Sequence, residues 1–179
     1  MKLMDKRGVG SGELERIRSG SGEALKEWKR LEQEKLALFQ KIHDPTTKDS
    51  DKYRSRITLL DPPANEVLEI TGRTSVELKL RIANQGIAAW PLGIEQSVRV
   101  GFAWFKKGAK PPLLIQRIKE ERCELPFVLR GGDTADFVCQ MPVNVQPGAY
   151  EVWIGLVHDG VTWFLEKGDE FLKLDVTVQ

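Results

Sequence analysis

The residues that could carry out chemistry in this sequence are few and widely spaced. It contains two histidines, His43 and His158, and two cysteines, Cys123 and Cys139. Neither histidine lies in a recognisable nucleophile motif, and the four residues lack the C-x-x-C or H-x₃-H spacing of metal sites. The sequence therefore predicts a protein that is not an enzyme and that holds neither a metal nor a cofactor.

Carboxylates offer the remaining catalytic candidates, because Glu120 and Glu121 occur together in the charged stretch 116–124. A glycosidase needs two carboxyl groups at a set separation, which a sequence does not reveal. The charges of this stretch are better explained as those of an exposed edge strand, where charge prevents pairing with other chains. We therefore expect a structural role for both glutamates.

The two cysteines both lie in segments that we expect to be strands. They can form a disulfide only if their Cα atoms lie within about 7 Å of each other. Reduced thiols in a cytoplasmic protein are the favoured interpretation, because no secretory signal or larger cysteine framework accompanies them. No segment reaches the ~18 apolar residues of a membrane span. With a net charge of +1, the chain has no bulk attraction for nucleic acid or an anionic membrane.

Strict alternation of apolar and polar residues predicts the elements that position these side chains. It is clearest in the segments 75–82, 98–104, 134–141, 150–156 and 172–178, each typical of a half-buried strand. Asp159-Gly160 predicts a type I′ hairpin turn. Because no helical segments separate the strands, residues 57–179 are expected to form a mainly β, immunoglobulin-like antiparallel β-sandwich.

Before the sandwich, the apolar residues recur with the spacing of a helix and no longer at every second position. Residues 1–20 have the composition of a flexible segment, residues 21–44 are expected to form an amphipathic or coiled-coil helix, and residues 45–56 a linker. The seam of the helix consists of Ala24, Trp28, Leu31, Lys35, Leu38 and Ile42. This seam either packs on the sandwich or another part of a longer protein, or makes the chain a homo-oligomer through residues 24–42.

Several motifs between residues 81 and 178 support the same architecture. They are "RIANQGIAAWP", "VRVGFAWF", "LRGGD", "PGAYEVWIGLVHDGVTWF" and "LKLDVTV". Together they resemble immunoglobulin-like accessory domains of bacterial polysaccharide-assembly proteins, above all the C-terminal carbohydrate-binding domain of O-antigen ABC-transporter ATPases. That resemblance implies a sandwich that recognises the end of a finished glycan. The motifs are also similar to the four-tryptophan immunoglobulin-like domain of selective-autophagy receptors, which implies a protein partner.

The phase of each strand indicates which aromatic rings could bind a ligand. Sugars commonly stack on an exposed ring while amides or carboxylates fix their hydroxyls. Trp104 is in phase with the core, Trp90 is expected to plug one end of the sandwich, and at most one of Trp163 and Phe164 faces inward. Trp153 is out of phase with the core, so it either binds ligand or covers the helix or the N-terminal segment. The predicted ligand-binding residues are Trp153, Trp163, Glu151, His158 and Asp159.

Two functions remain open from the sequence. The first is a glycan-binding module in surface-polysaccharide assembly, which predicts a concave, exposed face with an aromatic ring and convergent polar groups. The second is a protein-interaction or assembly module oligomerised through its helix. It predicts an exposed apolar patch or a free sheet edge.

Overall fold

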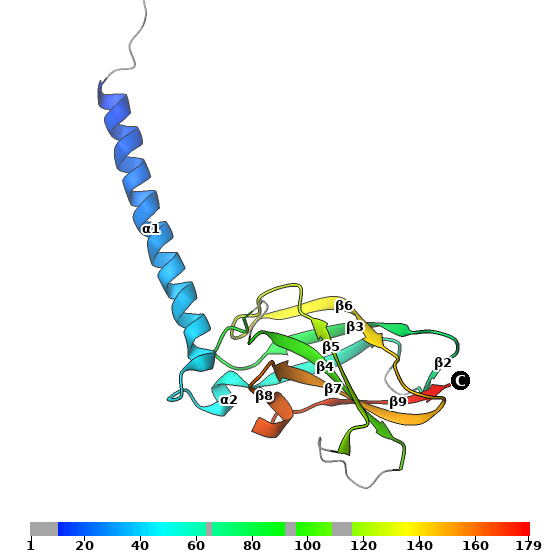
Figure 1. Ribbon diagram of the computed structural model, residues 1–179. Coiled ribbons are helices and arrows are strands. Elements are labelled where there is room, and N and C mark those ends of the chain that lie inside the picture. Colours follow the sequence, from blue (N-terminus) through cyan, green and yellow to red (C-terminus); the bar gives the residue numbers. More distant parts are fainter. Residues whose placement is uncertain (1–10, 64–65, 92–95, 109–115) are drawn as a thin grey trace, which may run out of the picture. The chain divides into compact units, whose positions relative to one another are not determined.

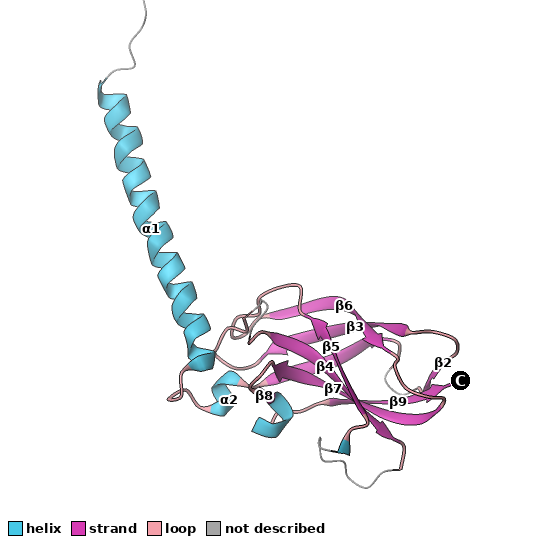
Figure 2. Cartoon of the chain, in the orientation of Figure 1, coloured by secondary structure: helices cyan, strands magenta, loops and turns pink. Residues whose placement is uncertain are grey.

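Two β-sheets stacked face to face form the larger part of this protein (Figure 1). The computed structural model describes residues 11–63, 66–91, 96–108 and 116–179. The chain divides into two units, Met1–Ala37 and Leu38–Gln179. The second unit contains all the strands, and Figure 2 separates them by colour from the helices.

The elements follow one another in this order. They are α1 (Ser11–His43), α2 (Asp49–Lys52), β1 (Ser55–Asp61), β2 (Leu68–Ile70), β3 (Ser75–Asn84), β4 (Val98–Lys106), β5 (Lys119–Glu124), β6 (Thr134–Pro142), β7 (Gly148–His158), β8 (Thr162–Trp163), the 3₁₀ helix η2 (Phe164–Lys167) and β9 (Leu172–Val178). The predicted fold class, a mainly β immunoglobulin-like sandwich, is confirmed.

The two sheets differ in size. The small sheet has the order β1-β3-β6, and the large sheet has the order β2-β9-β7-β4-β5, with β8 paired to β7. In β3, Val76, Leu78, Leu80 and Ile82 are buried while Glu77, Lys79 and Arg81 are exposed. This period of two places one face of the strand on the core and the other in water.

One strand pair departs from the predicted antiparallel arrangement. β2 runs parallel to β9, with Leu68 opposite Val176 and Ile70 opposite Val178. Between β1 and β3 of the small sheet the chain crosses to the edge of the large sheet, and there it runs in the same direction as β9. Alternation reports which face of a strand is buried and carries no information about the direction of its neighbour.

Helix α1 begins at Ser11, whereas the sequence predicted a start at residue 21. Gly20 and Gly22 suggested a flexible segment, yet both lie inside the helix. Glycine costs about 1 kcal/mol relative to alanine within a helix, which weakens the helix without ending it. The first ten residues of the predicted flexible segment lie outside the described residues.

The segment predicted as a linker is partly built into the sandwich. It contains α2 and a buried tyrosine, Tyr53, and β1 begins at Ser55, two residues before the predicted boundary. The backbone amides of Ile87 and Ala88 both donate to the carbonyl oxygen of Asp51, at 2.8 and 3.2 Å. A single buried aromatic ring produces no periodic pattern. The sequence therefore did not reveal that residues 51–53 are attached to the sandwich.

The main core fills the space between the two sheets. Trp104, which the sequence predicted in the core, and Trp90, which it predicted as a plug over one end, are both fully buried in it. Ile42 at the end of α1 also belongs to it. The indole Nε1 of Trp90 donates to the carbonyl oxygen of Lys52 at 3.2 Å. The hydroxyl of Tyr150 donates to the carbonyl oxygen of Gln146 at 2.6 Å, a tyrosine-corner bond of the kind found in immunoglobulin-like sandwiches.

The hairpin after β7 is present, but its turn is not the predicted type I′. His158 pairs with Thr162, which leaves three residues in the loop, and the amide of Val161 donates to the carbonyl oxygen of His158 at 3.0 Å. A type I′ turn needs positive φ at both of its central residues. Gly160 has a φ of 70°, whereas Asp159 is not among the residues with positive φ.

Candidate functional site

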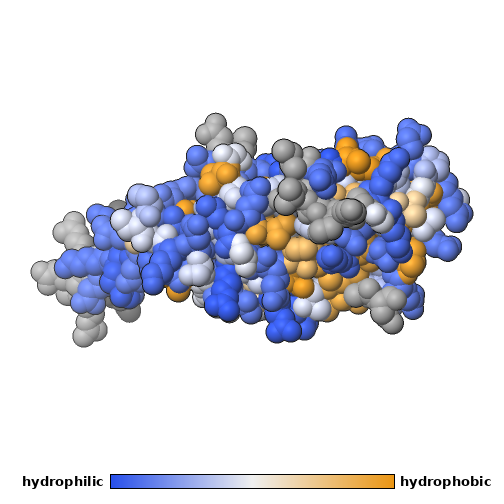
Figure 3. Space-filling model, turned by 90° about the horizontal axis from the view of Figure 1, so that it is seen from below, coloured by the Kyte–Doolittle hydropathy of each residue, from blue (hydrophilic) through white to orange (hydrophobic). Residues whose placement is uncertain are grey.

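A second apolar cluster covers the outer face of the large sheet. This outer-face cluster consists of Ala103, Phe105, Trp153, Val157 and Trp163, with the half-buried Leu165 and Phe171 packed against it. It contains both tryptophans that the sequence predicted to bind ligand. Figure 3 shows that apolar surface gathers over the middle of one face of the molecule, between hydrophilic surroundings.

Trp153 lies on the outer face, as its phase indicated, and its ring is covered by neighbouring side chains. Only 7% of the residue is exposed. Phe171 stacks on the indole at a centroid distance of 4.1 Å, and Phe105 lies at 4.8 Å. Lys173 Nζ lies 5.3 Å from the ring centroid, and Nε1 donates to Glu151 Oε1 at 2.5 Å. The ring therefore offers no open face to a ligand.

Trp163 is covered in a similar way, with 6% of the residue exposed. The guanidinium carbon of Arg122 lies 5.2 Å from the centroid of its ring. The carboxylate of Asp159 pairs with Arg99 at 2.8 Å and with Arg122 at 3.2 Å. Asp159, one of the predicted polar site residues, is thus engaged in a charge network beside Trp163. Its neighbour Phe164 faces the core, so one of the two rings points inward, as predicted.

His158 lies on the opposite side of β7 from the two tryptophans. It is buried, its Nδ1 lies 3.3 Å from Tyr53 Oη, and its ring centroid lies 5.3 Å from that of His43. Burial, followed by the neighbouring His43, lowers the pKa of His158 to about 4. The structure therefore places Glu151, Trp153, Asp159 and Trp163 on one face and separates His158 from them. A ligand-binding role for these five residues stays a prediction.

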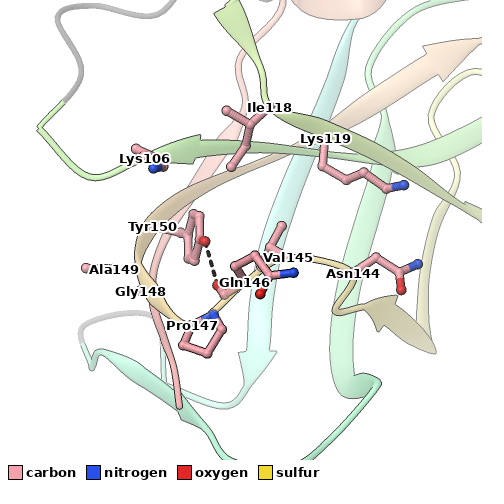
Figure 4. Close-up of a pocket in the computed structure, with 10 residues that line it drawn as sticks. All are labelled: Lys106, Ile118, Lys119, Asn144, Val145, Gln146, Pro147, Gly148, Ala149 and Tyr150. Carbon is pink, nitrogen blue, oxygen red and sulfur yellow. Dashed lines mark hydrogen bonds between the residues drawn. The ribbon is translucent and has the colours of Figure 1, made fainter.

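A cleft opens at the end of the sandwich where β7 begins. This β6–β7 cleft has a volume of about 520 Å³. Its lining comprises Lys106, Ile118, Lys119, Asn144, Val145, Gln146, Pro147, Gly148, Ala149 and Tyr150. In Figure 4, Ile118 extends from the start of β5 toward Val145 and Gln146 of the turn between β6 and β7. The cleft therefore brings together three segments that are distant in the sequence.

The polar groups of the β6–β7 cleft are amides and ammonium groups. Asn144 Nδ2 donates to Glu121 Oε1 at 3.1 Å, and Lys119 Nζ lies 3.5 Å from the same oxygen. In the described part of the chain, the side chains of Lys106 and Gln146 have no polar partner. The tyrosine-corner bond fixes the turn that carries Gln146 (Figure 4). Such groups can hydrogen-bond hydroxyls, while Ile118 supplies apolar contact area.

Sequence reasoning did not identify the β6–β7 cleft. Its local signal is the Pro147-Gly148 turn preceded by two amide residues, Asn144 and Gln146. That pattern is common in surface turns, where amide side chains hydrogen-bond the backbone. The opposing wall comes from Lys106 and Ile118, and only the folded structure brings it there.

A second cleft of about 530 Å³ lies near η2, and two of its lining residues, Ser55 and Asp169, pair with each other. The backbone amide of Ser55 donates to Asp169 Oδ1 at 2.9 Å, and the Ser55 hydroxyl donates to the other carboxylate oxygen. Burial raises the pKa of Asp169 above its usual range, an effect that the bonds from Ser55 partly oppose. Lys167 pairs with Asp49 at 3.1 Å. Arg54, Arg56 and Gln85 also line this cleft.

Two kinds of feature are absent from the described residues. No group of three or more histidine, cysteine, aspartate or glutamate side chains among them could hold a metal ion. In the same part of the chain, no helix is both long and apolar enough to cross a membrane.

Comparisons with known proteins gave partial matches among solved structures, with TM-scores below 0.5. Neither family models nor curated proteins gave a match. A CARDB domain from Pyrococcus furiosus, solved in complex with di-metal ions, matches with a TM-score of 0.35 and 12% identity over 70% of this chain and 86% of that chain. The C-terminal domain of Wzt matches with a TM-score of 0.38 and 13% identity over 70% of each chain.

A β-glucosidase from Listeria innocua also matches, with a TM-score of 0.38 and 15% identity. The match covers 70% of this chain and only 16% of the β-glucosidase.

Proposed function

We propose that this chain is a non-catalytic binding module whose sandwich recognises a glycan in the β6–β7 cleft. The observation that carries the proposal is the convergence in one cleft of the amide of Gln146 and the ammonium group of Lys106 with the apolar side chain of Ile118. Hydroxyl-rich ligands need this combination of hydrogen-bond donors and acceptors with apolar contact area. The resemblance of residues 81–178 to polysaccharide-assembly domains supports a bacterial surface polysaccharide as the glycan and the cytoplasm as the location.

The covered tryptophans support the choice of this cleft over the outer face. At 7% and 6% exposure, neither Trp153 nor Trp163 has a free ring for a sugar to stack on. The cleft also lacks a free ring, since Tyr150 is itself only 3% exposed. We therefore infer that hydrogen bonds contribute more than stacking to binding, which favours modest affinity for a single sugar unit and stronger binding of longer chains.

An oligosaccharide array followed by calorimetric titration tests the proposal. We expect Gln146→Ala and Lys106→Ala each to weaken binding of the oligosaccharide identified on the array by about threefold to thirtyfold, the loss of roughly one hydrogen bond. Lys79→Ala is the matched control, because Lys79 is exposed on the small sheet away from the cleft. An array without any bound oligosaccharide would contradict the proposal, as would equal affinities for the cleft variants and the control.

The outer face provides the comparison site for the same titration. Glu151→Gln and Lys173→Ala alter two side chains that contact Trp153, and both leave the ring in place. If these substitutions weaken binding while those in the cleft do not, the glycan binds at the residues predicted from the sequence.

A separate observation favours a second candidate function, the assembly of several copies of the chain through α1. Leu25, Trp28, Leu31 and Leu36 of α1 are between 51% and 58% exposed. Soluble monomers rarely leave several large apolar residues open along one helix. A second copy of the chain would cover them through the same helix. Ile42, the last residue of the seam predicted across residues 24–42, belongs to the sandwich core and so would not take part in this assembly.

Sedimentation velocity measures this assembly directly. We expect a concentration-dependent dimer or higher oligomer of the full chain at tens of micromolar, and loss of that species in the double variant Trp28→Glu, Leu31→Glu. Gln33→Glu adds a charge on the other side of the helix and is the control. A wild-type chain that stays monomeric would contradict assembly through α1 and leave the glycan proposal unaffected.

A further inference from the structure

The two cysteines face the interior of the sandwich from opposite sheets. Cys123 of β5 lies opposite Val100 of β4, and Cys139 of β6 lies opposite Leu78 of β3. Cys139 belongs to the main core, together with Val100 and Leu78, and the half-buried Cys123 packs against it. β5 is the edge of the large sheet and β6 the edge of the small sheet, and the two strands contact each other. The pair therefore lies where the edges of the two sheets meet.

The two thiols differ in exposure. Both are free, Cys139 is 2% exposed, and Cys123 is half-buried. A hydrogen bond from the Cys139 thiol lowers the pKa of Cys123 to about 7, although burial opposes this effect. The same contact and burial raise the pKa of Cys139. Cys123 is thus the thiol that a soluble reagent can reach, and Cys139 is the partner next to it.

We propose that Cys123 and Cys139 form a modification site at which a low-molecular-weight disulfide of the glutathione class oxidises them to an intrachain disulfide joining β5 to β6. The Cys123 thiolate attacks one sulfur of the oxidant, forms a mixed disulfide and releases one thiolate of the reagent. The Cys139 thiol then loses its proton, attacks the Cys123 sulfur and displaces the second reagent thiolate, which takes up the proton. Two protein thiols are oxidised and one reagent disulfide is reduced to two thiols.

The covalent bond would close one side of the sandwich. Within the described residues, β5 pairs only with β4, and β6 pairs only with β3. No backbone ladder connects these two edges across the core. A disulfide here joins the two sheets directly, and it does not depend on a glycan bound in the β6–β7 cleft. The chain then has a reduced form and an oxidised form that differ in the freedom of this edge.

Incubation of the full chain with mixtures of oxidised and reduced glutathione tests the proposal. The reaction is stopped by alkylation, and intact mass is measured with the protein unfolded. For the wild type we expect a monomer that has lost two hydrogen atoms and takes up no alkyl group. Cys139→Ser should retain one glutathione on Cys123, because the resolving thiol is gone. Cys123→Ser should stay unmodified in native buffer, because Cys139 is buried.

Three results would overturn the inference. The first is a wild-type chain that keeps glutathione bound, and the second is a disulfide-linked dimer on a non-reducing gel. The third is a wild-type chain whose two thiols remain free in buffer that contains only oxidised glutathione. The wild-type measurement decides the matter even if one of the serine variants does not fold.

Discussion

Gly101 of β4 and Gly155 of β7 lie directly opposite each other, and the indole of Trp163 lies over both. The two positions tolerate a side chain very differently. A Cβ atom at position 101 would lie 2.5 Å from the Trp163 ring and 2.6 Å from a methyl group of Val157. A Cβ atom at position 155 would lie 3.6 Å from the ring, an ordinary contact. The tryptophan therefore rests on Gly101 far more closely than on Gly155.

We predict that Gly101→Ala lowers the free energy of unfolding by about 1–3 kcal/mol, the usual effect of forcing an extra methyl group into a packed site. Gly155→Ala is the matched control. It should change stability by less than about 1 kcal/mol, and it can stabilise the protein by reducing the freedom of the unfolded chain. Urea unfolding followed by tryptophan fluorescence measures both. Equal destabilisation by the two substitutions would contradict this account of Trp163.

The hydroxyl of Tyr150 offers a second test of stability. Tyr150→Phe removes the 2.6 Å bond to the carbonyl oxygen of Gln146 and leaves that acceptor without its partner. We expect a loss of about 1–3 kcal/mol in the free energy of unfolding. Tyr53→Phe is a useful comparison, because the Tyr53 hydroxyl has only a longer contact of 3.3 Å with His158 and should cost less. A thermal unfolding midpoint that is unchanged in Tyr150→Phe would show that the corner bond contributes little.

His158 should make stability depend on pH. Its pKa is lowered from 6.5 to about 4 by burial and by His43, so the folded protein holds it neutral while the unfolded chain protonates it below pH 6.5. The stabilising contribution of the neutral ring is therefore complete above pH 6.5 and is lost as the pH falls toward 4. The loss should reach up to about 3 kcal/mol.

Chemical unfolding at a series of pH values measures this effect. The difference in stability between the wild type and His158→Phe should change across the window from pH 6.5 to pH 4 and stay constant above it. His43→Gln removes a neighbouring ring that contributes to lowering the pKa of His158, and should reduce the loss. A wild-type curve parallel to that of His158→Phe over the whole range would rule out His158 as the source.

The Cys123 thiol should react with iodoacetamide with a midpoint near pH 7, its expected pKa. Since the thiolate is the nucleophile, the rate should rise about tenfold between pH 6 and pH 8. Cys139→Ala removes the hydrogen bond that lowers the pKa and should move the midpoint up toward 9, the ordinary value. A midpoint that does not move in Cys139→Ala would show that the two thiols do not interact.

The sequence predicted the layers of this fold because alternation is a direct record of burial. The segment 75–82 alternates strictly, and β3 buries every second residue of it. The same logic placed Trp104 in the core and Trp153 on the outer face. Each of these predictions concerns which side of a strand a residue occupies, and strand geometry alone decides that.

Strand phase could not predict how exposed the candidate site residues are. Trp153 is covered by Phe105 from β4 and Phe171 from the segment before β9. Strand phase assigns a face to a side chain but does not say what covers that face. The β6–β7 cleft was missed for a related reason, because its walls come from segments far apart in the sequence. The start of α1 was misplaced because glycine weakens a helix without always ending it.

The position of β9 has a consequence for the synthesis of the protein. β9 lies between β7 and β2, and the backbone amide of Gln179 donates to the carbonyl oxygen of Ile70 at 2.8 Å. β2 has no strand partner other than β9 among the described residues, so it stays unpaired while a ribosome is still translating the segment 172–178. The sandwich closes only after those residues have emerged, and pairing across so many residues is slow. Until then, the edge of β7 that later pairs with β9, from Gly148 to Ile154, keeps its backbone hydrogen-bonding groups unpaired.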